Sequence, residues 1–197
     1  MAYILIFISA ILVNNIVLSQ FLGICPFLGV SKKIDTALGM SAAVAFVLTL
    51  ATIITYLLQQ LLVKFGLEFL QTISFILVIA ALVQMVEIVL KKISPSLYQA
   101  LGVFLPLITT NCCILGVSIL VANATYKLPE GLEPNLLTGV LFAIATALGF
   151  GLALTLFAGI REQLALTKLP KGMEGTPIAL VVAGLLAMAF MGFSGVC

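Results

Sequence analysis

Six long apolar stretches constrain the fold of this chain more than any other feature. They cover residues 3–30, 37–62, 67–90, 97–126, 136–160 and 176–196, with polar segments between them. A helix needs roughly 20 apolar residues to cross the hydrocarbon core of a bilayer, and each stretch meets that length. Of the 197 residues, 63% are hydrophobic and only 8% are charged, which is outside the range of soluble domains. The sequence predicts an all-α integral membrane protein with six transmembrane helices in a single domain, residues 1–197.

The basic residues indicate how these helices are oriented. Seven of the nine follow the first, third or fifth stretch, and two follow the second or fourth; they are Lys32, Lys33, Lys91, Lys92, Arg161, Lys168 and Lys171 against Lys64 and Lys127. Lys and Arg concentrate in the cytoplasmic connections of membrane proteins, so we expect both termini to lie outside the cytoplasm. No basic stripe with interleaved aromatic residues is present, so membrane lipid and not nucleic acid is the expected surface partner.

A six-residue pattern occurs twice in the apolar stretches. Cys-x-apolar-Leu-Gly-Val stands at residues 25–30 and again at 112–117, an odd number of spans later. Lys32 and Lys33 follow the first copy, whereas Lys91 and Lys92 precede the span that carries the second. The pattern therefore meets the cytoplasm at opposite ends, which is typical of an inverted repeat whose site lies near the membrane midplane. We expect two inverted three-helix repeats, about residues 1–92 and 93–197.

The first and fourth stretches are too long for one straight crossing. About 28 residues with a rise of 1.5 Å each would cover roughly 42 Å, against a hydrocarbon core of roughly 30 Å. Gly23 and Pro26 flank Cys25, while Pro106 and the Thr-Thr-Asn step at 109–111 precede Cys112. Because proline lacks the backbone N–H that a helix interior needs, we expect helices one and four to be broken at the Cys motifs.

The duplicated cysteines are candidate metal ligands. A half-helix that begins at Cys25 or Cys112 would direct its positive N-terminal end at the thiol, and thiolates favour zinc or iron–sulfur. Iron–sulfur clusters are usually held by four cysteines, so we expect a partner chain to supply two more. Cys113 would point about 100° away from Cys112 on a helix, and Cys197 is the last residue. For these two, an inert sulfur remains the simpler interpretation.

Chemistry by the chain alone is not indicated. It has no His, which excludes histidine acid–base and nucleophilic catalysis, and the apolar stretches contain no carboxylate pair. Phosphate-binding motifs are absent, so no nucleotide or flavin site is predicted. Glu87 is either a functional acid inside the membrane or half of a helix-end pair with Lys91. Asn14, Asn15 and Asn111 either satisfy freed backbone groups or line an ion path.

Particular residues resemble a known family. Residues 14–33, residues 105–112 and the ending at 187–195 closely resemble the corresponding stretches of the RnfA component of Rnf electron-transport complexes. The match covers essentially the whole chain. The NqrE component of the sodium-translocating NADH:quinone oxidoreductase is a close relative, but Asn14-Asn15 and Cys25-Pro26 are more similar to the Rnf form.

The resemblance implies a six-helix subunit that pairs with a homologous protein of opposite orientation, RnfE. The pair would hold a 2Fe-2S cluster in mid-membrane, with Cys25 and Cys112 as this chain's iron ligands, because Cys112 is the cysteine that follows Asn111. Such complexes, which also contain RnfB, RnfC, RnfD and RnfG, lie in the prokaryotic cytoplasmic (inner) membrane. They pass electrons between ferredoxin and NAD and move sodium ions or protons, with flavins on other components.

Two other functions explain the same pattern. A redox-silent secondary transporter or ion-channel component would also have inverted repeats and broken helices. A structural scaffold around redox proteins would leave both cysteines replaceable. The presence of a sulfur in equivalent places of both halves favours the electron relay over these alternatives.

Overall fold

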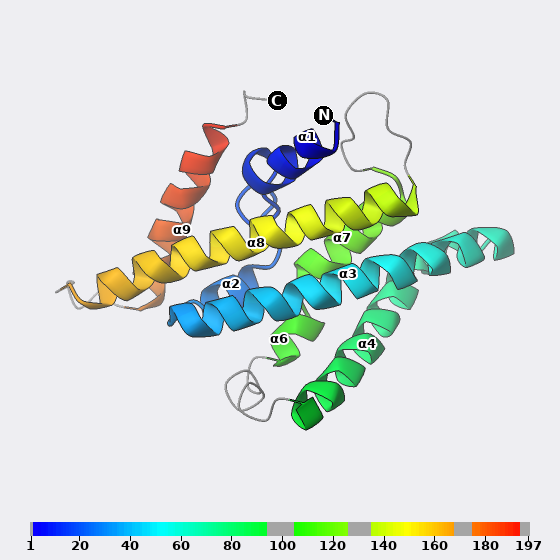
Figure 1. The fold of residues 1–197 in the computed structure, drawn as a ribbon, viewed down its shortest axis with the longest axis horizontal. Coiled ribbons are helices and arrows are strands. Elements are labelled where there is room, and N and C mark those ends of the chain that lie inside the picture. Colours follow the sequence, from blue (N-terminus) through cyan, green and yellow to red (C-terminus); the bar gives the residue numbers. More distant parts are fainter. Residues whose placement is uncertain (1, 94–104, 126–134, 168–174, 194–197) are drawn as a thin grey trace.

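The computed structural model describes residues 2–93, 105–125, 135–167 and 175–193. These residues form helices and no strand (Figure 1), which agrees with the all-α prediction. The elements are α1 (Ala2–Ile8), the π-helix η1 (Ser9–Val13), α2 (Ile24–Gly29), α3 (Ile34–Phe65), the 3-10 helix η2 (Glu68–Leu70), α4 (Gln71–Ile93), α6 (Leu105–Thr109), α7 (Cys112–Ala122), α8 (Leu136–Ala165) and α9 (Thr176–Met191).

Two long helices, α3 and α8, form the centre of the molecule. They lie side by side and run in opposite directions (Figure 1). Both helices carry fully buried side chains, among them Met40 and Leu48 on α3 and Phe150 and Phe157 on α8. An ideal Cβ on Gly151 of α8 would lie 3.3 Å from Cβ of Ser41 on α3. Small residues of this kind let membrane helices approach closely, and that packing stabilises helix pairs in lipid.

Local signals in the sequence set the ends of these helices. Gly66 ends α3 in the left-handed conformation, with φ of 68°, and its N–H bonds to the carbonyl of Leu62. Glycine adopts this conformation without steric cost and is common after a helix. At the start of α8, the backbone N–H of Asn135 donates to Oγ1 of Thr138 at 2.8 Å, as part of a capping box.

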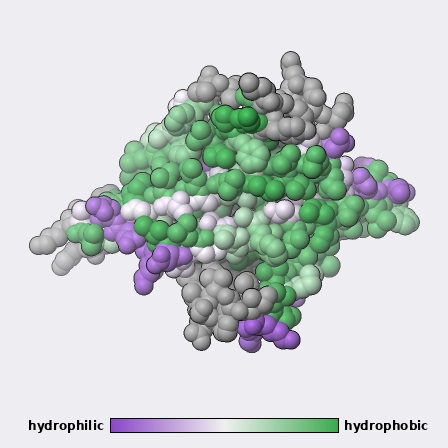
Figure 2. Space-filling view, in the orientation of Figure 1, coloured by the Kyte–Doolittle hydropathy of each residue, from purple (hydrophilic) through white to green (hydrophobic). Residues whose placement is uncertain are grey.

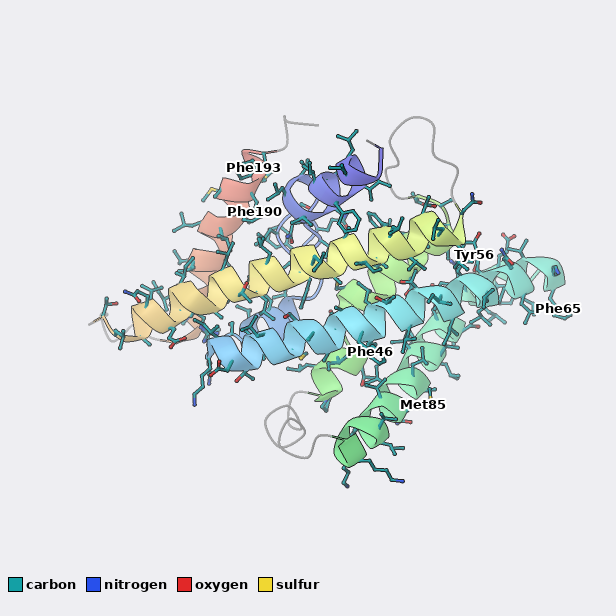
Figure 3. All side chains as sticks on the ribbon, in the orientation of Figure 1. Phe46, Tyr56, Phe65, Met85, Phe190 and Phe193 are labelled. Carbon is teal, nitrogen blue, oxygen red and sulfur yellow. The ribbon has the colours of Figure 1, made fainter. Side chains whose placement is uncertain are left out.

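The outer surface suits a lipid environment. Within the described residues, three helical segments are long and apolar enough to cross a membrane, Ile34–Phe65, Glu68–Val89 and Leu136–Ala165. Three shorter apolar ones there are Ile4–Val13, Pro106–Ala122 and Thr176–Met191. Large apolar side chains such as Phe46, Phe65 and Met85 point outward (Figure 3) and are more than half exposed. Hydrophobic residues cover most of the visible face, and hydrophilic ones gather near helix ends (Figure 2).

The two overlong stretches are not continuous helices in the structure. In the first, helical structure ends at Val13 and resumes at Ile24; in the second, Thr110 and Asn111 separate α6 from α7. Pro26 lies in the first turn of α2, where its missing N–H removes no helical hydrogen bond, so the chain is interrupted before Pro26 and not at it. Pro106 is the second residue of α6 as described. Residues 97–104, Lys127, Lys168, Lys171 and Cys197 lie outside the described residues.

Candidate functional site

Cys25 is the second residue of α2 and is exposed. The residue before the helix, Gly23, has φ of 82°, and Phe21 also has a positive φ, of 55°. These left-handed residues turn the chain out of the non-helical segment 14–23 and into α2. Only a helix of six residues follows, and its N-cap makes no side-chain hydrogen bond. The chain around Cys25 therefore depends on other elements for its position.

The helix α8 provides that support. Phe27 of α2 stacks on Phe157 of α8, with ring centroids 4.3 Å apart and an interplanar angle of 15°. One turn later on α8, Nη1 of Arg161 donates to the carbonyl of Leu28 and to Oγ of Ser31, each at 2.8 Å. The Arg161 guanidinium also lies 5.9 Å from the centroid of the Phe157 ring. A cation that bonds the last carbonyls of a helix stabilises its C-terminal end.

Cys112 is held differently, as the first residue of α7. The preceding Asn111 is the N-cap, and its Oδ1 accepts a hydrogen bond from the backbone N–H of Cys113 at 3.0 Å. The Cys112 thiol is exposed, and its Sγ lies 3.9 Å from the carbonyl oxygen of Thr110. The neighbouring Cys113 is fully buried in the apolar core. The two adjacent cysteines thus point to different environments, as the angle between successive helical residues requires.

Gly23 brings the two cysteine segments together. An ideal Cβ on Gly23 would lie 3.0 Å from Oδ1 of Asn111, 3.2 Å from Cβ of Cys113 and 3.1 Å from Cε2 of Phe150. Cys25 follows Gly23 by two residues, and Cys112 lies between Asn111 and Cys113 in the sequence. The contact point of Gly23, Asn111 and Cys113, which we call the junction, is therefore within two residues of both exposed cysteines along the chain.

The glycines of the duplicated pattern make reciprocal contacts across this region. A Cβ on Gly116, in the second copy, would lie 2.9 Å from Cδ1 of Leu22, which precedes the first copy. A Cβ on Gly29, in the first copy, would lie 3.2 Å from Cδ1 of Leu107, which precedes the second copy. Each motif therefore packs against a leucine from the segment that precedes the other, and a larger residue in place of either glycine would have to displace the end of that leucine side chain.

The thiols of Cys25 and Cys112 could supply half of the ligands of a metal centre. Two thiols at the surface can bind iron only together with further ligands, because a 2Fe-2S cluster takes four. Among the residues that the structure describes, no group of three or more His, Cys, Asp or Glu side chains could hold a metal ion. Nδ2 of Asn111 is buried and has no hydrogen-bond partner in the described residues. A group with acceptor atoms at the junction would satisfy this donor.

The other polar residues that stand out in the apolar stretches lie elsewhere. Asn15 is buried: its Nδ2 donates to the carbonyls of Gly149 at 2.8 Å and Ile11 at 3.1 Å, and its Oδ1 accepts from the N–H of Val17 at 3.2 Å. It satisfies freed backbone groups, which is one of the two expected roles. Glu87 is half-buried on α4, four residues before Lys91.

The whole chain matches one family of proteins. Residues 3–197 match the family model described as "Rnf-Nqr subunit, membrane protein". This chain belongs to the Rnf-Nqr family. The resemblance that the two cysteine stretches indicated is therefore confirmed, and the family description agrees with the apolar helices of the structure.

Three relatives illustrate how far the similarity extends. The chain is 58% identical over 196 residues to the A component of the Na⁺-translocating ferredoxin:NAD⁺ oxidoreductase complex of Acetobacterium woodii, covering 99% of this chain and 98% of the relative. It is 56% identical over 192 residues to the A component of the ion-translocating oxidoreductase complex of Syntrophotalea carbinolica, with 97% and 95% covered. To the protein of the same name from Ectopseudomonas mendocina it is 55% identical over 193 residues, with 98% and 96% covered.

Arg161 has a role at this site that the sequence did not predict. Its position in the sequence indicates only membrane topology, yet the side chain anchors the C-terminal end of α2. The sequence did contain a signal that Arg161 faces the same neighbour as Phe157. The two residues are four apart at the end of an apolar stretch, and i and i+4 side chains share one face of a helix. The acceptors of its hydrogen bonds are 130 and 133 residues away, so the sequence alone did not identify them.

Proposed function

We propose that this chain is a membrane component of an ion-translocating ferredoxin:NAD oxidoreductase complex. In this proposal, Cys25 and Cys112 supply two of the four ligands of a 2Fe-2S cluster, and a homologous chain, RnfE, supplies the others. The observation that supports the proposal is the contact of Gly23 with Asn111 and Cys113, which brings the chain segments of two exposed cysteines together. The names of relatives that are 50–58% identical support the function of the complex.

When bound, such a cluster supplies a one-electron carrier at membrane depth. The residues of this chain hold the ligands in place. Asn111 caps the helix that begins at Cys112, and Arg161 with Phe157 fixes the short helix of Cys25. The packed core excludes bulk water from the inner side of the two cysteine segments. It includes Cys113 and Phe150, which are fully buried. The exposed side of the junction is the place for the partner's two cysteines.

The orientation of the chain is part of the proposal. The antiparallel arrangement of α3 and α8, the middle helices of the two predicted repeats, supports an inverted repeat with helices one and four broken at the Cys motifs (Figure 1). Arg161, which begins the fifth connection, bonds Ser31 in the first, so these two basic connections lie at one end. We propose that this end is cytoplasmic, with both termini outside the cytoplasm in the prokaryotic inner membrane, and that RnfB, RnfC, RnfD and RnfG complete the assembly.

The test is to replace each cysteine in the whole complex. Cys25→Ser and Cys112→Ser should each abolish cluster assembly and ferredoxin-linked electron transfer, because serine removes a soft ligand. Iron, acid-labile sulfide, the EPR signal of the reduced cluster and ferredoxin:NAD turnover are the measurements. Cys113→Ala and Cys197→Ala are the matched controls and should keep the cluster. If both serine variants assemble with full iron and turnover, a redox-silent transporter component replaces the electron relay.

A further inference from the structure

The helix α4 is the least covered of the three long helices. It lies at the edge of the molecule (Figure 1) and packs against α3, α6 and α7. In its most apolar part only 22% of the residues are buried, against 39% in α3 and 50% in α8. Phe75 and Val83 of α4 are buried in the core, so the side of the helix that faces away from them is open. In a membrane, either lipid or another protein must cover this side.

Five exposed residues follow one line along the open side of α4. They are Ile73, Leu77, Ala81, Gln84 and Ile88, which we call the α4 stripe, and their spacings are four, four, three and four residues. Alternating steps of three and four place side chains along one seam, as at the contact of two packed helices. The three large apolar members are 64–68% exposed. Ala81 is small, and small residues let membrane helices approach closely.

Gln84 is the polar member of the α4 stripe. Its side chain is exposed and makes no hydrogen bond with any residue that the structure describes. It stands inside the apolar segment Glu68–Val89, five residues before the end, which is about 7.5 Å along a helix axis. Long lysine and arginine side chains can extend to water from inside a membrane, but glutamine is shorter. An amide in an apolar environment without a hydrogen-bond partner is costly, so Gln84 requires a partner group from outside the chain.

Several other polar side chains of the long helices are satisfied within the chain. Oγ1 of Thr55 on α3 and Oγ1 of Thr146 on α8 donate to the carbonyl four residues earlier, at 2.7 and 2.8 Å. Gln71, at the start of α4, donates to Oδ1 of Asn123 at 3.0 Å. Lipid acyl chains offer no hydrogen-bonding group to Gln84, whereas a polar side chain on a neighbouring helix does. The amide of Gln84 therefore favours a protein over lipid as the cover of the α4 stripe.

We propose that the α4 stripe is the contact face for a transmembrane helix of another component of the complex. That helix is apolar, and at the depth of Gln84 it carries a hydroxyl, amide or carboxyl group that pairs with the Gln84 amide. Relatives of this chain are named as A components of complexes, so other components are available to cover the face. A polar residue in an apolar seam fixes the register of two helices. The inference rests on the proposed function only in that this chain belongs to a membrane complex.

The experiment places the photoreactive residue p-benzoylphenylalanine at position 84 in the whole complex. Native membranes are irradiated, the complex is purified, and mass spectrometry identifies the cross-linked peptide. We expect a covalent link to a membrane helix of a different component. The matched control carries the same residue at position 85. Met85 is also more than half exposed (Figure 3), lies at nearly the same depth and points about 100° away around the helix, so its link to that component should be several-fold weaker.

A second measurement tests the hydrogen bond itself. Gln84→Leu removes the amide and keeps a side chain of similar size. It should weaken the retention of the linked component about threefold in a titration with detergent, which is the average effect of one hydrogen bond between membrane helices. Met85→Leu is the control and should retain that component as the unchanged chain does. Iron per complex should stay unchanged in both variants.

The outcomes separate this proposal from the electron relay. A link to another component from position 84 and a much weaker one from position 85 support the contact face. Equal links from both positions, links to lipid alone, or a link to a second copy of this chain overturn it. If the photoreactive residue at position 84 prevents assembly, position 77 replaces it with the same readings. Loss of iron in Cys25→Ser tests the relay alone, because position 25 is not part of the α4 stripe.

Discussion

The two cysteine helices carry the same six-residue pattern but are supported in different ways. α7 has 11 residues, a side-chain N-cap in Asn111 and a buried side in the core. α2 has six residues and no side-chain cap, and it is held by Phe157 and Arg161 of α8. The position of Cys112 is therefore set largely by its own segment, whereas the position of Cys25 is set by a helix more than 120 residues later in the sequence.

This difference predicts which element each cysteine depends on. Changes in α8 should disturb Cys25 first, and changes in the cap of α7 should disturb Cys112 first.

The largest effect is expected from Gly23→Ala, which disturbs both helices at once. Alanine in the left-handed region costs about 1–2 kcal/mol, and its Cβ would also meet Asn111, Cys113 and Phe150. We expect loss of most of the cluster, measured as iron per complex, and a lower thermal midpoint. Gly66→Ala is the control, because Gly66 has a similar φ of 68° with no atom within 4 Å of the added Cβ. Equal losses in both variants would mean that the junction contacts contribute nothing.

A smaller effect, confined to the α2 side, is expected from Arg161→Leu. The change removes the two hydrogen bonds that Arg161 donates to Leu28 and Ser31, and it leaves the Gly23 junction and the N-cap of α7 unchanged. The thiol of Cys25 in cluster-free complex should then react faster with a maleimide reagent, while Cys112 should react at its usual rate. Glu162→Gln, on the exposed neighbour, is the control. Similar acceleration at both cysteines would contradict the separate support of the two helices.

The smallest effect is expected from Asn111→Ala, which acts on the α7 side. Loss of an N-cap side chain costs about 1 kcal/mol. The thermal midpoint should fall slightly and Cys112 should become the more reactive thiol. Asn111→Ser restores a side-chain acceptor for the N–H of Cys113 and should recover most of the stability. If serine behaves like alanine, the cap is not what holds Cys112.

Much of this arrangement was predictable because it depends on local pattern. The long apolar stretches predicted an all-helical membrane protein, and a role in satisfying backbone groups was one of the two expected for Asn111, which caps α7. The family followed from the stretches around Cys25 and Cys112. The prolines by themselves did not give the exact bounds of the interruptions, since a proline both ends one helix and is well tolerated in the first turn of the next, and the sequence does not distinguish these places.

The sequence by itself determined which segments are apolar and long enough to enter a membrane, since hydropathy and the length of a helical crossing are properties of one segment at a time. It also determined that two cysteines stand in equivalent contexts. Only the tertiary structure decided that Gly23 joins their helices, that Arg161 anchors the short one, and that Asn15 binds backbone groups of α8. Each of these depends on contacts between residues far apart in the chain, and such contacts form only when the helices pack.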